Sequence, residues 1–145
     1  MIKITPMGEE HITGIAQLEK ECFSQPWSES GLREELTNNS AVFFAAEDDG
    51  KVVGYMGANF ILDEGYITNI AVTEKRREEG IGSLLMERMT EEAKNRKLSF
   101  ISLEVRVSNE KAISLYEKSG FKKLGIRKNF YEKPVEDAAI MTKYL

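Results

Sequence analysis

The feature that most constrains this chain is a basic, glycine-containing stretch, Arg77-Glu-Glu-Gly80-Ile-Gly82-Ser83, that lies between two apolar segments. Residues 66–72 before it have strand character, and an amphipathic segment begins near Ile81. We therefore expect a strand, a tight turn and a helix, in that order. Because the first N–H groups of a helix are unpaired and its dipole is positive there, the turn favours a bound anion. Glycine at positions 80 and 82 would let a pyrophosphate approach the backbone closely.

Two other phosphate-binding motifs fit this stretch poorly. A Walker A loop ends in Gly-Lys-Ser/Thr, and no lysine follows Gly82. A dinucleotide fingerprint needs three glycines in the first strand–helix unit, whereas this turn has two glycines and lies past the middle of the chain. From the spacing alone, a glycine turn that binds nothing remains an alternative.

Length and charge limit the possible classes of protein. A chain of 145 residues suits one domain, residues 1–145, with a single core. It has no apolar run near the ~20 residues that span a bilayer and no signal-peptide pattern, so we expect no membrane contact and a cytoplasmic location. The net charge of −4 argues against nucleic acid as a partner and suits a cationic one, such as an amine or a basic peptide.

The cysteine and histidine content argues against a disulfide and a metal centre. Cys22 is the only cysteine and His11 the only histidine, too few for a usual zinc ligand set. A reactive thiol needs a nearby cationic group, and only Lys20 lies close to Cys22 in sequence. We therefore expect Cys22 to be inert and partly buried.

Hydrophobic periodicity predicts a mixed α/β domain in which early helices precede a strand meander and then an alternation of helices and strands. Strands are expected at residues 2–5, 41–46, 51–61, 66–72, 98–107, 121–127 and 138–143, and helices at 8–21, 28–36, 81–96 and 109–119. Turns are expected at Asp48-Asp49-Gly50 and Asp63-Glu64-Gly65, and Ser28 is the expected N-cap of the second helix.

Three polar residues follow the glycine stretch at suggestive positions. Glu104 lies in a strand after a crossover helix, where we expect a near-central, covered and unpaired carboxylate, which is rare without a function. A place on a solvated strand face is the alternative for Glu104. Asn109 and Tyr116 lie two turns apart on one face of the next helix. Tyr116 could also be a plain core residue, although buried tyrosines usually give their hydroxyl a partner.

The order and spacing of these motifs resemble the GNAT superfamily of acetyltransferases and, within it, the ribosomal-protein-alanine N-acetyltransferases. The resemblance covers essentially the whole chain. It implies an α/β fold with a central, mostly antiparallel sheet, flanked by helices, and a V-shaped splay between the fourth and fifth strands. The motifs are Pro26-Trp-Ser-Glu29, Asn69-Ile-Ala-Val72, the Arg77–Ser83 stretch, Leu103-Glu-Val-Arg106, Ser108-Asn109, Ala112-Ile-x-Leu-Tyr116-Glu, Gly120-Phe121 and Glu136-Asp-Ala-x-Ile-Met141.

The resemblance also implies acetyl-CoA as cosubstrate, bound in the V-shaped gap. Backbone groups of Ile70, Ala71 and Val72 would hold the pantetheine and the acetyl carbonyl, and Asn109 would meet the pantetheine arm. The pyrophosphate would be held by Arg77, Glu78, Glu79, Gly80, Ile81, Gly82 and Ser83. Glu78 and Glu79 depart from the family, which often has neutral or basic residues there, so we expect both side chains to point to solvent.

The implied reaction is direct attack of a free α-amine on the thioester in a ternary complex. Glu104 would act as general base, and Tyr116 would return a proton to the CoA thiolate. A phenol with a pKa of about 10 suits a leaving thiolate with a pKa of about 8.5. The Val72 N–H would stabilise the oxyanion. Neither an enzyme nucleophile nor a metal is expected.

The acceptor implied by the resemblance is a protein N-terminus, namely the N-terminal alanine of a small-subunit ribosomal protein. Trp27, Tyr131 and Asp137 are candidate contacts to it. Trp27 could instead be a hydrophobic anchor between helices, and Asp137 could cap a turn before the last strand. Two other functions stay open, acetylation of a small amine and non-catalytic binding of acyl-CoA.

Overall fold

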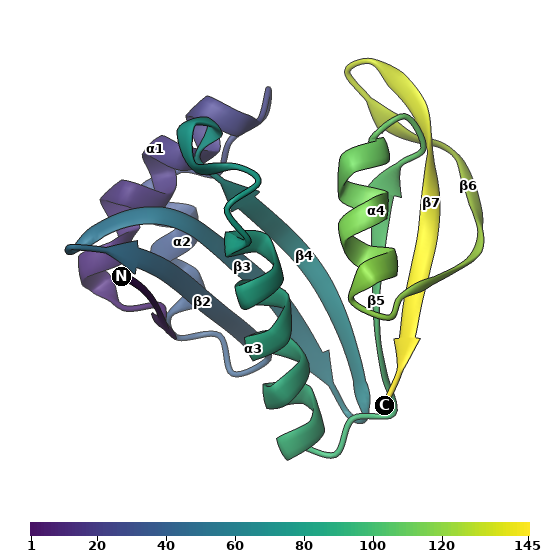
Figure 1. Ribbon diagram of the computed structural model, residues 1–145, viewed down its shortest axis with the longest axis horizontal. Helices are drawn as coiled ribbons and strands as arrows, with labels where there is room; N and C mark the ends of the chain where they lie inside the picture. Colours follow the sequence, from purple (N-terminus) through teal and green to yellow (C-terminus); the bar gives the residue numbers. More distant parts are fainter.

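The fold is one seven-stranded sheet with helices on both faces (Figure 1), and the computed structural model describes residues 1–145. The strand order is β1-β2-β3-β4-β5-β7-β6, and every neighbouring pair is antiparallel except β4 and β5. The strands are β1 Ile2–Pro6, β2 Ala41–Asp48, β3 Lys51–Ile61, β4 Glu64–Val72, β5 Phe100–Arg106, β6 Lys122–Glu132 and β7 Val135–Tyr144. This architecture confirms the predicted fold class.

The helices begin and end close to the predicted residues. They are α1 Ile12–Cys22, α2 Glu29–Glu35, α3 Ile81–Asn95 and α4 Glu110–Lys118, with short 3-10 turns at Glu9–His11 and Glu74–Arg76. The predicted N-cap is confirmed, because the Ser28 hydroxyl accepts the Gly31 N–H at 3.1 Å. None of these helices combines the length and apolar character needed to cross a membrane.

Both predicted turns are present, but the second begins one residue earlier and ends two residues earlier than predicted. Asp49 and Gly50 join β2 to β3 with φ of 51° and 77°, as a two-residue hairpin turn requires. The next turn is Leu62-Asp63, whereas Glu64 and Gly65 already belong to β4. Gly65 is needed for packing, since a Cβ there would lie 2.6 Å from Cγ2 of Ile101 in β5.

The last two strands are longer than predicted and form a hairpin across residues 133–134. Arg127 pairs with Ala138 and Tyr131 with Glu136, so the chain advances four residues along β6 but only two along β7. This bulge contains Asn129, with φ of 51°, and it breaks the alternation of side chains. The sequence pattern therefore ended at residue 127, although the strand continues.

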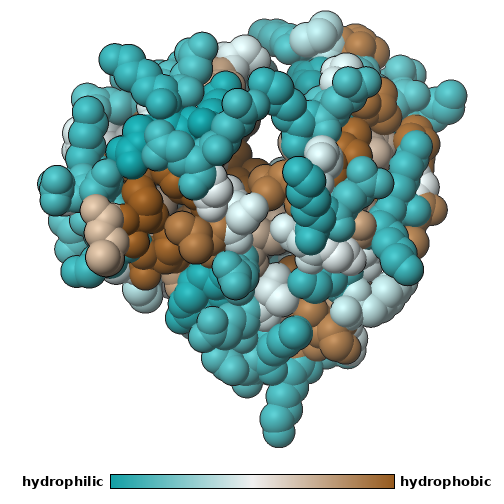
Figure 2. All heavy atoms as spheres, in the orientation of Figure 1, coloured by the Kyte–Doolittle hydropathy of each residue, from teal (hydrophilic) through white to brown (hydrophobic).

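The sheet splits between β4 and β5. These parallel strands pair only through Glu64–Phe100, Gly65–Ile101 and Tyr66–Ser102, and beyond that point they diverge (Figure 1). The space-filling view shows an opening through the molecule in this region (Figure 2). We call the space between residues 67–72 of β4 and 103–106 of β5 the fork; it is the splay that the family resemblance implied.

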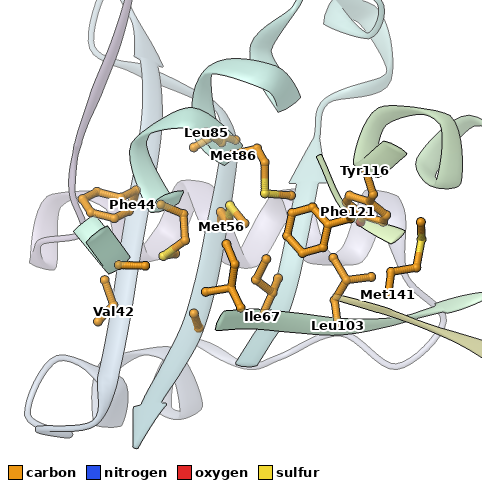
Figure 3. Close-up of a cluster of buried hydrophobic side chains, with 14 of the residues drawn as sticks. Val42, Phe44, Met56, Ile67, Leu85, Met86, Leu103, Tyr116, Phe121 and Met141 are labelled. Atoms are coloured by element: carbon orange, nitrogen blue, oxygen red, sulfur yellow. The ribbon is translucent and has the colours of Figure 1, made fainter. Parts of the chain in front are cut away.

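Two apolar clusters cover the two faces of the sheet. The smaller joins α1 and α2 to β2, β3 and β4, around Ile15, Leu32 and Tyr55. The larger packs α3 and α4 against strands on both sides of the fork (Figure 3). Since α1 and α2 contact only the β4 side, the face of β5 and β7 opposite α3 and α4 carries no helix.

Candidate active site at the fork

Alternate residues of β4 direct their backbone groups into the fork. The Thr73 N–H donates to the Val53 carbonyl at 2.8 Å, so Val72 and its opposite residue Gly54 form a pair without mutual hydrogen bonds. The N–H and C=O groups of Val72, and by the same alternation those of Ile70, point away from β3 toward the fork. Ala71 lies between them and uses its backbone groups to pair with β3. Ile70 and Val72 are thus the two predicted residues that offer N–H donors here.

The Val72 carbonyl already has protein partners. It accepts Nε of Arg77 at 3.1 Å and lies 3.7 Å from Sγ of Cys22, while Nη2 of Arg77 lies 3.4 Å from the same sulfur. Arg77, 55 residues away in the chain, thus supplies a cationic neighbour in addition to Lys20, the one that lies close in sequence. Burial nevertheless raises the thiol pKa of Cys22, against the opposing effect of Arg77. This direction agrees with an unreactive thiol.

The glycine stretch forms an uncapped helix N-terminus. Gly80 is the N-cap residue of α3, with φ of 86°, and no side chain caps the helix. The Gly80 carbonyl accepts the Leu84 N–H, so the N–H groups of residues 81–83 have no helical partner. A Cβ on Gly80 would enter open space, whereas one on Gly82 would lie 3.1 Å from Leu115 of α4. Gly80 thus fits a ligand cradle, and Gly82 lies in a tight contact with α4, where a larger residue would have to displace the Leu115 side chain.

Glu78 and Glu79 point away from this cradle. The Glu78 side chain is 80% exposed, with its carboxylate 3.6 Å from Lys111. The Glu79 side chain is 45% exposed and binds Arg76 at 2.9 Å. Both acidic residues therefore lie in solvent, as expected, and a bound pyrophosphate would not have to displace their side chains.

Glu104 lies on the uncovered face of β5, at the fork. Its neighbours Leu103 and Val105 point into the larger core, so Glu104 points to the opposite face, where it is 32% exposed. The expectation of a covered, unpaired carboxylate is wrong on both counts. No helix covers this face, and Nε of Arg127 lies 3.6 Å from Oε1 of Glu104. Glu104 is reachable from solvent and carries a cationic neighbour.

Tyr116 of α4 lies on the other face of the sheet, in the larger core. Its ring packs in the larger core, 6.0 Å from the ring of Phe121. No hydrogen bond from the protein reaches its hydroxyl. Burial, and then the charge of Tyr131, raise the pKa of Tyr116. The phenol therefore stays protonated and has a free O–H to donate.

Tyr131 connects the two sides of the site. It is half-buried, and its pKa is raised by burial and by the charge of Glu104. The guanidinium of Arg106 lies 4.3 Å above its ring. Arg106 is held in place by the Pro134 carbonyl at 2.9 Å and the Glu136 carboxylate at 3.2 Å. Glu104, Tyr131 and Tyr116 are thus electrostatic neighbours around the fork.

Trp27 has the contacts of a hydrophobic anchor. Its half-buried ring lies 6.2 Å from that of Phe43, and its backbone N–H donates to the Glu19 carboxylate at 3.0 Å. Glu19 is only 1% exposed and also accepts the hydroxyl of Tyr55. These contacts support the role of Trp27 as a hydrophobic anchor, and none of them indicates a contact with an acceptor.

The two remaining predicted residues have local structural partners. The Asp137 carboxylate accepts the Asn129 N–H at 2.9 Å and so holds the β6 bulge. Oδ1 of Asn109 accepts the Ala112 N–H at 3.2 Å, which makes Asn109 the N-cap of α4. Neither carboxylate nor amide is directed at the fork by these bonds.

Sequence reasoning missed three residues around the site. Arg127 faces Glu104, Arg106 covers Tyr131, and Glu19 fixes the backbone at Trp27. The β6–β7 register would have revealed the first two, but the bulge hides that register from the alternation of side chains. Glu19 could be recognised in the sequence only as a single charged residue on the otherwise apolar face of the first helix.

Comparison with known proteins places this geometry in a family. Residues 12–121 match the model of the acetyltransferase (GNAT) family. A Bacillus subtilis protein provisionally named a [ribosomal protein bS18]-alanine N-acetyltransferase is 38% identical over 91% of this chain and 88% of its own length. The Escherichia coli K12 [ribosomal protein bS18]-alanine N-acetyltransferase is 34% identical over 97% of this chain and 96% of its own. The crystal structure of an E. coli ribosomal-protein-S18-alanine N-acetyltransferase superposes with a TM-score of 0.90 at 31% identity, over 99% of this chain and 94% of that one.

Proposed function

The chain belongs to the acetyltransferase (GNAT) family, and we propose that it transfers the acetyl group of acetyl-CoA to the free N-terminal α-amine of a protein. The favoured acceptor is the N-terminal alanine of a small-subunit ribosomal protein, since relatives with that name align with nearly the whole chain. The observation that carries the proposal is the fork, with Glu104 partly exposed on one face of the sheet and Tyr116 on the other face.

The donor side of the site is built from backbone. The uncapped N–H groups of residues 81–83 suit a pyrophosphate, and the open space beside Gly80 leaves room for it. The N–H groups of Ile70 and Val72 suit the amide and thioester carbonyls of acetyl-CoA, which supplies the activated acyl group. Arg77 already binds the Val72 carbonyl, so its role toward the pyrophosphate is to fix the turn as much as to add charge.

The acceptor side needs a proton acceptor. An α-ammonium group with a pKa of 7.7–8.0 is mostly charged at pH 7, and releasing its lone pair costs about 1 kcal/mol. Glu104 can take this proton directly or through water, because its carboxylate is accessible. Since the deprotonation cost is small, positioning of the amine against the thioester supplies more of the rate.

Tyr116 faces the leaving group. Its raised pKa makes complete proton transfer to a thiolate with a pKa of about 8.5 unfavourable. We infer that Tyr116 stabilises the departing thiolate through a hydrogen bond, and that solvent completes the protonation. Partners would be protein N-termini, and the cytoplasm, where ribosomal proteins are made, is the proposed location.

The test is thiol release from acetyl-CoA with an Ala-starting ribosomal-protein peptide, beside the same peptide with a blocked N-terminus. Turnover is expected with the free amine alone. Glu104→Gln and Tyr116→Phe should each lower kcat by about 10²-fold or more, whereas Glu132→Gln, an exposed carboxylate of β6, should not. Equal turnover of both peptides, or full activity of both site variants, would refute the proposal. Turnover with small amines only would move the acceptor to that class.

A further inference from the structure

Arg127 is the one cation in contact with the Glu104 carboxylate. It lies on β6, two strands away from Glu104 on β5, with β7 between them. The β7 residue opposite Arg127 is Ala138, whose small side chain lets the arginine reach across toward β5. The Glu104 charge also raises the pKa of two neighbouring phenols, in both cases as a smaller effect than the main cause, which is a side-chain hydrogen bond for Tyr66 and burial for Tyr131.

The Arg127–Glu104 contact is weak and easily broken. It has one Nε–Oε1 approach of 3.6 Å, and the Arg127 side chain is 57% exposed. Arg106 makes a useful comparison, because it binds two backbone carbonyls and a carboxylate and covers the ring of Tyr131. Arg106 is therefore a fixed part of the hairpin, whereas the Arg127 side chain has no other hydrogen bond or ion pair and only a longer ring contact, 5.7 Å from the centroid of Phe130.

We propose that Arg127 is a positioning residue that occupies Glu104 in the resting enzyme and is displaced by the α-ammonium group of the acceptor. The inference rests on the proposed function, because it takes Glu104 as the group that receives the acceptor. One cation replaces another, so the carboxylate always has a partner. A blocked or neutral N-terminus cannot make this exchange, and Arg127 thus adds selectivity for a free amine.

If Arg127 competes with the acceptor for Glu104, removing the Arg127 charge should increase the affinity of the enzyme for the acceptor peptide. An exposed ion pair contributes about 0.2–1 kcal/mol, which corresponds to about 1.4–5-fold in affinity. Arg127→Gln should lower KM for the Ala-starting peptide by this factor, while KM for acetyl-CoA stays unchanged. Arg127→Lys, which keeps the charge, should stay near wild type.

Lys128→Gln is the matched control. Lys128 is the next residue after Arg127, and its side chain is exposed and forms no ion pair, so the substitution removes the same charge without affecting Glu104. It corrects for the general attraction of a cationic peptide to a less positive surface. The sharpest measurement is peptide affinity by calorimetry with CoA present. In the Glu104→Gln background, adding Arg127→Gln should change peptide affinity no more than Lys128→Gln does.

Three results would overturn the inference: a higher peptide KM in Arg127→Gln, a change equal to that of Lys128→Gln, or an effect that persists without the Glu104 carboxylate. If Glu104→Gln is inactive while Arg127→Gln matches its control, only this inference fails. If Glu104→Gln is fully active, the proposed role of Glu104 fails first and the inference fails with it.

Discussion

Replacing Tyr55 by Phe should destabilise the protein, because the buried carboxylate of Glu19 would lose a hydrogen-bond donor. The Glu19 carboxylate is 1% exposed and has no cationic partner; its two donors are the Tyr55 hydroxyl and the Trp27 N–H. A buried carboxylate depends on its hydrogen bonds because it has lost its hydration. Tyr55→Phe leaves one carboxylate oxygen without a donor.

The expected loss is that of a hydrogen bond to a charged group, about 1.5–3 kcal/mol in the free energy of unfolding. For a domain of this size, that lowers Tm by about 3–12 °C. Glu19→Leu alone orphans both donors, but in the double variant only the Trp27 N–H loses its partner. The two substitutions should therefore cost clearly less together than the sum of their separate costs.

Urea unfolding of the two single variants and the double variant measures this coupling. Tyr66→Phe is the control, because its hydroxyl bonds the exposed side of Glu64 and its loss should leave stability near wild type. If Tyr55→Phe is as stable as Tyr66→Phe, or if the costs of Tyr55→Phe and Glu19→Leu simply add, the carboxylate is not held in the way described.

Three further predictions concern the turn, the thiol and the hairpin. Gly80→Ala and Gly50→Ala both force alanine to a positive φ and should each cost about 1–2 kcal/mol in thermal unfolding, but only Gly80→Ala should also raise KM for acetyl-CoA. Cys22, whose pKa is raised by burial, should react with iodoacetamide at pH 7.5 more slowly than free cysteine, and a faster reaction would contradict this. Hydrogen bonds from Ser108 and the charge of Arg106 lower the pKa of Glu136, so its contribution to stability is present above about pH 4.3 and lost as the pH falls through the folded-state pKa. The Tm difference between wild type and Glu136→Gln should therefore be seen at pH 7 and vanish in acid, and a difference that persists at pH 3 would count against it.

Local chemistry made much of the fold predictable. Asp49-Gly50 has the backbone freedom that a two-residue hairpin needs, and Ser28 can satisfy the first N–H groups of a helix, so both features are written in a few adjacent residues. The strand–turn–helix at Gly80 is of the same kind. The split sheet was not visible in these local patterns and came from the resemblance of whole motifs to a family.

The errors share a physical origin, because each involves residues that are distant in the chain. Arg127 meets Glu104 only after the sheet has formed. Gly65 was taken for a turn residue because a sequence does not reveal that Ile101 will pack against it.

Because β4 and β5 pair over a short length, the separation of the two strands at the fork is set by side-chain packing and not by backbone hydrogen bonds. Only three residue pairs join β4 to β5, while one apolar cluster continues from Met56 of β3, on one side of the fork, to Phe121 on the other side (Figure 3). The Met86 side chain of α3 lies between Met56 and Phe121 in this cluster (Figure 3). A smaller or larger residue in place of Met86 would therefore change the separation of β4 and β5 from within the core, at a distance from the strands' own backbone.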